Sequence, residues 1–126
     1  MAVEPVDTPS APPVAGPYSP AVRAGEWLVL AGQVGLGADG RLVDGVEAQA
    51  RQVLNNIEAV LRDCGASLSD VAKATVFVTD LRDFATVNAA YASAFGAHRP
   101  ARSTVEVAGL PGGASVEIEV WAHVPR

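Results

Sequence analysis

Apolar and polar residues alternate along three stretches of the chain, Val71–Thr79, Ser103–Val107 and Val116–Val124. Successive side chains of a β-strand point to opposite faces, so this alternation predicts three strands. In the last of them, Glu117 and Glu119 share the face opposite the apolar residues. The segment between the last two stretches is rich in glycine and proline. We therefore expect these two strands to form a hairpin that ends the domain.

Apolar residues recur every three or four positions in two further stretches, which predicts two amphipathic helices. The apolar stripe of the first helix consists of Val46, Ala50, Val53, Ile57, Val60 and Cys64. The stripe of the second consists of Phe84, Val87, Tyr91, Ala94 and Phe95. Gly65 and Gly96 are expected to end these helices, and Asp83 is placed to cap the start of the second. Gln49 and Asn56 are expected on the solvent side of the first helix.

The run Trp27–Ala31 is continuously apolar and predicts a short strand buried on both faces. Two helices can cover one face of a single sheet, so the order of elements predicts an α+β two-layer sandwich with a mixed sheet. The other face combines polar and apolar side chains: Thr75, Phe77, Thr79, Glu117, Glu119 and Trp121. A mixed face that includes tryptophan is typical of a subunit interface, so we expect a homo-oligomer with sites shared between subunits.

The N-terminal residues differ in composition from the rest of the chain. Residues 1–13 contain four prolines and are interpreted as a flexible arm, followed by a single domain over residues 14–126. Gly16–Pro20 holds Tyr18 between two prolines, which restrict the backbone on either side of it. Packing of Tyr18 on the domain edge is the simplest interpretation of this segment.

Composition narrows the classes of function. The net charge is −5 and there is no block of basic residues, which argues against nucleic acid or an anionic membrane as a partner. Cys64 is the single cysteine, so no internal disulfide can form, and with His98 and His123 it makes no metal-binding spacing. Neither a targeting segment nor a membrane-spanning run is evident, so a soluble cytoplasmic protein is expected.

Two residue types on the predicted terminal strands could carry chemistry. Arg102 directly precedes the alternating run, and a guanidinium there can bind a small carboxylate through two parallel hydrogen bonds. A glutamate at a partly dry position, Glu117 or Glu119, can exchange a proton with water. An ordinary surface ion pair between these residues is the simpler alternative on spacing alone. Asn88 of the second helix is either solvated or a ligand contact.

Several ordered motifs resemble one known family, the RidA/YjgF/UK114 reactive-intermediate deaminases. The signature is carried by Pro100–Val105, Glu106–Leu110 and Val116–Ile118. Further matching pieces are Gly16–Ser19, Ala31–Gln33, Gln49–Arg51 with Asn55 and Asn56, Lys73–Val78 and Phe84–Asn88. The resemblance covers roughly Val14 to Val124. It implies a chorismate-mutase-like fold and a homotrimer with three clefts between subunits.

The resemblance also implies an activity, the hydrolysis of 2-imino and enamine acids such as 2-aminoacrylate to 2-oxo acids and ammonia, without a cofactor or metal. In this family Arg102 is expected to bind the substrate carboxylate and Glu117 to position and deprotonate water. The backbone near Ala31 and Gly32 and the side chains of Tyr18 and Asn88 are expected to shape the pocket, which holds a small imino, enamine or 2-oxo acid.

Two positions depart from the family pattern, in which many members have a serine where this chain has Ala31 and a cysteine where it has Thr104. Both positions are associated with the substrate cleft. The loss of one hydroxyl at position 31 removes a polar contact of about 1 kcal/mol. A non-catalytic carboxylate sensor or a chaperone-like member of the family is therefore the alternative function.

Overall fold

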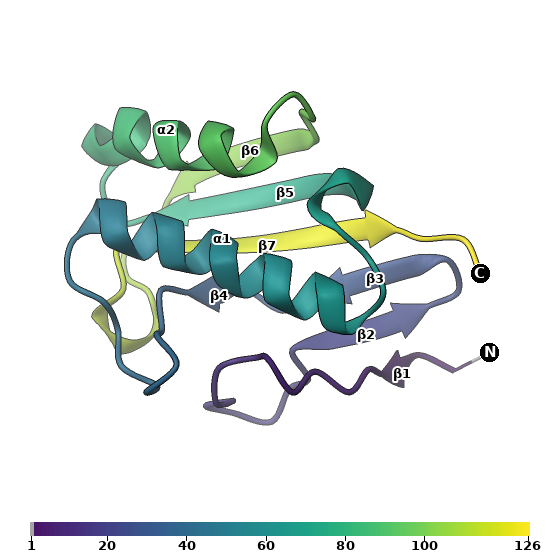
Figure 1. The fold of residues 1–126 in the computed structure, drawn as a ribbon. Helices are drawn as coiled ribbons and strands as arrows, with labels where there is room; N and C mark the ends of the chain where they lie inside the picture. The colour runs from purple at the N-terminus through teal and green to yellow at the C-terminus, as the bar shows by residue number, and fades with distance from the viewer. Residues whose placement is uncertain (1) are drawn as a thin grey trace.

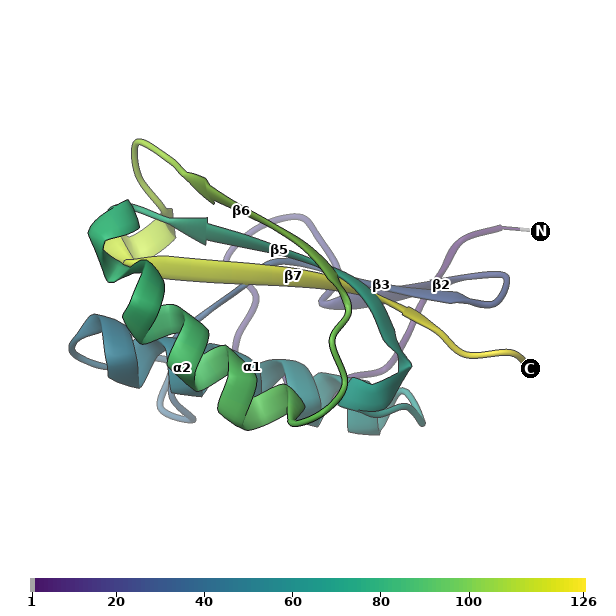
Figure 2. The same cartoon turned by 90° about the horizontal axis from the view of Figure 1, so that it is seen from above.

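The computed structural model describes residues 2–126, which fold into two layers around one mixed sheet. The strands follow the order β1-β2-β3-β7-β5-β6, and β4 is also paired with β7. They are β1 (Glu4–Pro5), β2 (Ala21–Ala24), β3 (Trp27–Leu30), β4 (Gln33–Val34), β5 (Val71–Val78), β6 (Ala101–Glu106) and β7 (Val116–His123). The helices α1 (Val46–Asp63) and α2 (Phe84–Phe95) cover one face of this sheet (Figures 1 and 2). The predicted α+β architecture is therefore confirmed.

The predicted hairpin between the last two strands is wrong. β6 pairs in parallel with β5, and β7 runs antiparallel to β5 on its other side, so β5 separates the two strands. Strand β5, helix α2 and strand β6 form a crossover unit, the usual connection between parallel neighbours. Strand β7 buries every second residue completely, as a central strand must, whereas β6 forms the edge of the sheet and buries none fully.

Strand β3 is buried on one face only, which corrects the expectation for Trp27–Ala31. Leu28 and Leu30 are buried against the helices, whereas Trp27 is 38% exposed on the open face of the sheet. Its ring stands edge-to-face against Trp121 of β7, with the ring centroids 6.2 Å apart. Within residues 2–126 no helix covers this face, so it retains exposed aromatic surface (Figure 2).

Gly65 ends α1 as predicted, because it adopts a left-handed conformation with φ of 77°. Its N–H donates to the carbonyl of Arg62 and the N–H of Ala66 donates to that of Leu61, at 3.0 and 2.8 Å. These two bonds form a Schellman motif, which satisfies carbonyls at the helix end. Cys64 occupies the C-cap and packs against the core.

Two amides of α1 are buried, which corrects their predicted placement in solvent. Gln49 is 5% exposed and Asn56 is 7% exposed. The side-chain oxygen of Gln49 accepts from the N–H of Ser115 at 2.8 Å, and Nδ2 of Asn56 donates to the carbonyl of Leu36 at 2.9 Å. Buried polar groups require such partners, so these amides fix the loops that flank β4 and β7 to the helix.

The buried side of α2 differs in three places from the predicted stripe. Phe84 is exposed and so is Ala94, while Ala90 is buried beside Val87 and Tyr91. Asp83 occupies the N-cap position but makes no side-chain capping bond. Gly96, with φ of 63°, ends the helix as expected. Phe84 is 42% exposed, and its ring lies beside Arg102 of the edge strand β6.

The described residues of the N-terminal arm lie against the domain. Glu4 and Pro5 pair with β2, and the N–H of Val6 donates to the carbonyl of Ala21 at 3.0 Å. The backbone N–H and the hydroxyl of Ser10 donate to the two carboxylate oxygens of Asp63, at 2.8 and 2.9 Å. The division of the chain after residue 13 stays a prediction.

Neither helix in the described part of the chain combines the length and the apolar character that crossing a bilayer requires.

Candidate functional site

Arg102 lies at the start of β6 and reaches toward α2. Its Nη2 donates to Oδ1 of Asn88 at 2.6 Å, a short charge-assisted hydrogen bond. The guanidinium carbon lies 4.7 Å from the centroid of the Tyr91 ring and 5.7 Å from that of Phe84. Cation–π contacts of this kind restrict the guanidinium plane without using its N–H groups. One N–H of Nη2 is thus occupied, and one complete edge of the guanidinium is left to bind a carboxylate.

Tyr91 is a site residue that the sequence pattern assigned only to the core. Phe84, Asn88 and Tyr91 are separated by four and three positions, so they share one side of α2, and this spacing could have grouped them around Arg102. Tyr91 is 5% exposed and its hydroxyl is buried without a hydrogen-bond partner. An unpaired buried hydroxyl costs about 1–3 kcal/mol. The ring therefore supports Arg102 at some cost in stability.

A hollow of about 290 Å³ opens beside this arginine. Its lining residues are Asn88, Tyr91, Ala92, Arg99, Pro100 and Arg102. Thr104 lies two residues beyond Arg102 on the same side of β6 and is half-buried. The structure thus brings three predicted site residues, Asn88, Arg102 and Thr104, to one edge of the protomer.

Glu117 belongs to a second hollow, at the other face of the sheet. This hollow measures about 270 Å³ and is lined by Pro13, Ala15, Tyr18, Gly32, Val34, Leu36, Gly40, Pro111, Gly112 and Glu117. Tyr18 lines this hollow and is 51% exposed, so its ring is only partly packed on the domain edge. Glu117, Gly32 and Tyr18, all predicted from the resemblance, therefore form one group.

Gly32 is required for the position of the Glu117 side chain. A Cβ at position 32 would lie 2.8 Å from Cδ and 3.0 Å from Oε2 of Glu117, closer than real Cβ contacts. The carboxylate therefore packs directly on the backbone where β3 leads into β4. The neighbouring Ala31 has its N–H engaged by the carbonyl of Pro20 at 2.9 Å.

Burial raises the pKa of the Glu117 carboxyl above its ordinary value, and the negative charge of Glu119 raises it further. Glu119 lies two residues along the same strand and faces the same side of the sheet. A carboxylate with a raised pKa is a stronger base than an exposed one. Glu117 is therefore suited to take a proton from water.

The two groups lie on opposite faces of the sheet in one protomer. Arg102 pairs with Ala74, whose side chain is fully buried under the helices. Glu117 pairs with Phe77, three residues further along β5 and therefore on the other face. A small acid bound to Arg102 cannot reach Glu117 of the same chain. Arg102 and Glu117 could lie in one cleft only if they came from two copies of the chain, and this arrangement stays a prediction.

Other parts of the described chain offer less chemistry. No group of three or more histidine, cysteine, aspartate or glutamate side chains within residues 2–126 is arranged to hold a metal ion. Burial raises the pKa of the Cys64 thiol, and the charge of Asp63 adds to this effect, which keeps the sulfur in its unreactive protonated form.

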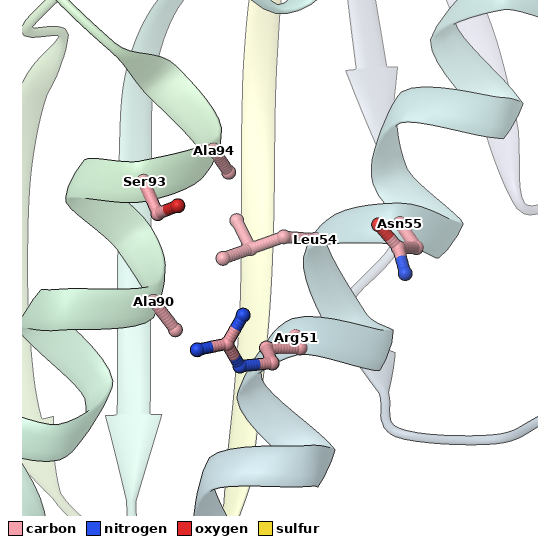
Figure 3. Close-up of a pocket in the computed structure, with 6 residues that line it drawn as sticks. All are labelled: Arg51, Leu54, Asn55, Ala90, Ser93 and Ala94. Atoms are coloured by element: carbon pink, nitrogen blue, oxygen red, sulfur yellow. The ribbon is translucent and has the colours of Figure 1, made fainter.

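A further hollow of about 190 Å³ lies between the two helices (Figure 3). Its lining residues are Arg51, Leu54, Asn55, Ala90, Ser93 and Ala94. Nη2 of Arg51 is paired with Glu47 at 3.2 Å, and both side chains are well exposed. This hollow contains none of the predicted site residues.

Comparison with known proteins gives consistent relatives over nearly the whole chain. The model of the endoribonuclease L-PSP family matches residues 8–124. A protein named 2-iminobutanoate/2-iminopropanoate deaminase from Salmonella typhimurium is 44% identical over 121 residues, which cover 93% of this chain and 94% of that protein. A RutC family protein of Pyrococcus horikoshii is 46% identical over 122 residues, with 95% and 97% covered.

Solved structures agree with these relatives. The crystal structure of RidA from the Antarctic bacterium Psychrobacter sp. has a TM-score of 0.93 and 40% identity, covering 96% of this chain and 99% of that one. The structure of a putative endoribonuclease from Thermotoga maritima has a TM-score of 0.92 and 43% identity, with 98% of both chains covered.

Proposed function

The chain belongs to the endoribonuclease L-PSP family, which includes RidA and YjgF, and we propose that it is a hydrolytic deaminase of reactive 2-imino and enamine acids. The observation that carries this proposal is the pair of complementary groups. A restrained guanidinium with a free edge occupies one hollow, and a carboxylate with a raised pKa occupies another. These are the two groups that hydrolysis of a small imino acid needs.

The carboxylate of the substrate binds the free edge of Arg102 through two parallel hydrogen bonds. Glu117 takes a proton from a water molecule as the water oxygen bonds to the imine carbon, which gives a carbinolamine. The protonated Glu117 then returns the proton to nitrogen. Glu117 then moves a second proton, from the carbinolamine hydroxyl to the nitrogen. The carbon–nitrogen bond breaks with its electron pair leaving on ammonia, and the electron pair released on oxygen forms the carbonyl of the 2-oxo acid. An enamine enters the same sequence after it tautomerises to the imine.

The complete site forms between two copies of the chain, in a homotrimer with three equivalent clefts. In one protomer Arg102 and Glu117 lie on opposite faces of the sheet, so a head-to-tail contact must bring the β6 edge of one copy to the Glu117 hollow of the next. The exposed aromatic surface of Trp27 and Trp121 on the open face supports such burial.

The changes at Ala31 and Thr104 alter the walls of the cleft rather than its two reactive groups. Ala31 contributes no hydroxyl, and its backbone N–H is already bonded to Pro20. Thr104 supplies a small hydroxyl beside Arg102 on β6. We therefore expect these residues to affect substrate preference more than the occurrence of the reaction.

A shared site can be tested by mixing two inactive variants. Arg102→Ala and Glu117→Gln should each abolish ammonia release from a freshly generated 2-iminobutanoate. When the two variants are unfolded together in equal amounts and refolded, about half of the clefts receive an intact Arg102 and, independently, about half receive an intact Glu117. About a quarter of the clefts then hold both intact residues, so about a quarter of the wild-type activity should return. Full activity of either variant alone would refute its assignment, and a mixture that stays inactive would refute the shared cleft.

Carboxylate binding without turnover is the second candidate, because the Arg102 hollow is complete within one protomer. Tight binding of 2-oxobutanoate, in a protein that does not accelerate the decay of 2-iminobutanoate, would favour this sensor function. A role in RNA cleavage, which the family description names, is opposed by the net charge of −5.

A further inference from the structure

Two arginines border the hollow beside α2. Arg102 enters it from β6, and Arg99 lines it from the short connection between α2 and β6. Nη1 of Arg99 donates to the backbone carbonyl of Gly96, at the C-terminal end of α2, and more distantly to that of His98, at 3.4 Å. These bonds use only part of the guanidinium of Arg99, so it keeps donors for a ligand.

Neither arginine is neutralised by an acid in the described part of the chain. The hollow has no aspartate or glutamate among its lining residues, and no ion pair involves Arg99 or Arg102 within residues 2–126. Of the six other arginines, four have acidic partners: Arg51 with Glu47, Arg62 with Glu58, Arg82 with Asp80, and Arg126 with Glu4. Arg23 and Arg41 have none within residues 2–126, but neither lines this hollow. Two unpaired guanidinium groups on one hollow are unexpected in a protein with a net charge of −5.

The two arginines line the same hollow, and both charges act on the same buried group. Burial raises the pKa of the Tyr91 hydroxyl, while Arg102 and Arg99 both act to lower it. Because like charges repel, each guanidinium is stabilised by an anion placed between them. The volume of about 290 Å³ is also near the lower end of ligand pockets, which begin at about 300 Å³. A substrate of three or four carbons would leave part of it empty.

We propose that Arg99 forms a subsite for a second anionic group, and that the preferred substrates are dicarboxylic 2-imino acids. This inference rests on the proposed deaminase function. Arg102 binds the carboxylate next to the imine carbon, and Arg99 binds the carboxylate at the end of the side chain. A carboxylate fits this position because its two oxygens match the planar donors of arginine.

The test compares the hydrolysis of two substrates by the wild-type protein and by the Arg99→Gln variant. The imines of glutamate and of 2-aminobutanoate are generated in situ by an amino-acid oxidase, and their hydrolysis is followed. Loss of one charge-assisted contact should lower kcat/KM for the dicarboxylic imine about tenfold or more, and for 2-iminobutanoate less than about twofold. Arg51→Gln, which removes an exposed arginine between the helices, should change neither value. Equal effects of Arg99→Gln on both substrates would overturn the subsite.

Binding of the stable products separates this inference from the deaminase function itself. By calorimetry, wild-type protein should bind 2-oxoglutarate more tightly than 2-oxobutanoate, and Arg99→Gln should remove most of that difference. If no imine is turned over but this selectivity is found, the deaminase function is wrong and the anionic subsite stands. If 2-iminobutanoate is turned over but the wild-type protein shows no preference for the dicarboxylic acid, the subsite is wrong and the deaminase function stands.

Discussion

Replacement of Gly32 by alanine should lower the catalytic activity without lowering the stability of the fold. The added Cβ would meet Cδ of Glu117 at 2.8 Å, Oε2 at 3.0 Å and Cγ at 3.1 Å. An ordinary contact begins at 3.4 Å, so the carboxylate must move away from the backbone by at least the difference of 0.6 Å. Because Glu117 is a rotatable side chain, it can make this movement by changing its rotamer rather than by displacing the strand.

The expected loss follows from the sensitivity of catalysis to position. A misplacement of about 1 Å in a catalytic group costs up to about 100-fold in rate, so we expect kcat for 2-iminobutanoate hydrolysis to fall about 10- to 100-fold. Gly32 is absent from the glycines with positive φ, so alanine can adopt its backbone conformation. The free energy of unfolding should therefore stay constant or rise by about 0.4–1 kcal/mol, because alanine restricts the unfolded chain.

The measurements are ammonia release from in-situ generated imine and denaturant unfolding of the same preparations. Gly109→Ala is the matched control, because its added Cβ would meet nothing within 4 Å and its φ is also not positive. It should leave kcat unchanged. A Gly32→Ala protein with wild-type kcat would refute the reasoning that backbone contact positions the acid, and a loss of activity matched by a loss of stability would refute the rotamer explanation.

Four further predictions address the other site residues. Tyr91→Phe should raise the free energy of unfolding by about 1 kcal/mol, because it removes a buried hydroxyl without a partner, and destabilisation in denaturant unfolding would contradict this. Arg102→Lys should lower kcat/KM at least about tenfold, since an ammonium cannot make two parallel bonds, and unchanged kinetics would exclude the bidentate contact. The rate should fall as the pH drops through the raised pKa of Glu117, because only the carboxylate accepts a proton. Glu119→Gln removes a charge that raises this pKa, so the acidic limb of the pH–rate profile should move to lower pH, and an unmoved limb would show that Glu117 is not the base.

The local elements of this fold could be predicted from periodicity, but the pairing of its strands could not. The stripe from Val46 to Cys64 and the terminating Gly65 describe α1 closely, because helix formation and capping depend on neighbouring residues. Strand partners are set by long-range packing, and proximity in the chain wrongly favoured a hairpin between β6 and β7. The complete burial of alternate residues along β7 marks it as central, but alternation alone does not distinguish a central strand from an edge strand.

The candidate site could be predicted partly from residue type and partly from resemblance. The strand positions of Arg102 and of Glu117 or Glu119 indicate a carboxylate site, whereas the choice of Glu117 and the role of Asn88 come from the matching motifs. The contact of Tyr91 with Arg102 could not be predicted from the sequence, because an aromatic residue at helical spacing also fits a position in the core. The burial of Gln49 could not be predicted from the sequence, because an amide side chain is usually exposed to solvent. It is buried here because it accepts a hydrogen bond from the N–H of Ser115, a partner that only the structure identifies.

That the proposed site requires a second copy of the chain follows from the strand register. Arg102 lies beside Ala74 and Glu117 beside Phe77, so an odd number of residues along β5 separates their partners. Side chains alternate across a sheet, and an odd separation places the two groups on opposite faces whatever their rotamers. A shift of one residue in the pairing of β6 would place both on one face, but it would also turn Arg102 away from Asn88 and Tyr91. The contacts that restrain the guanidinium therefore point it away from its own Glu117, so the proposed site, which combines both groups, requires a second protomer.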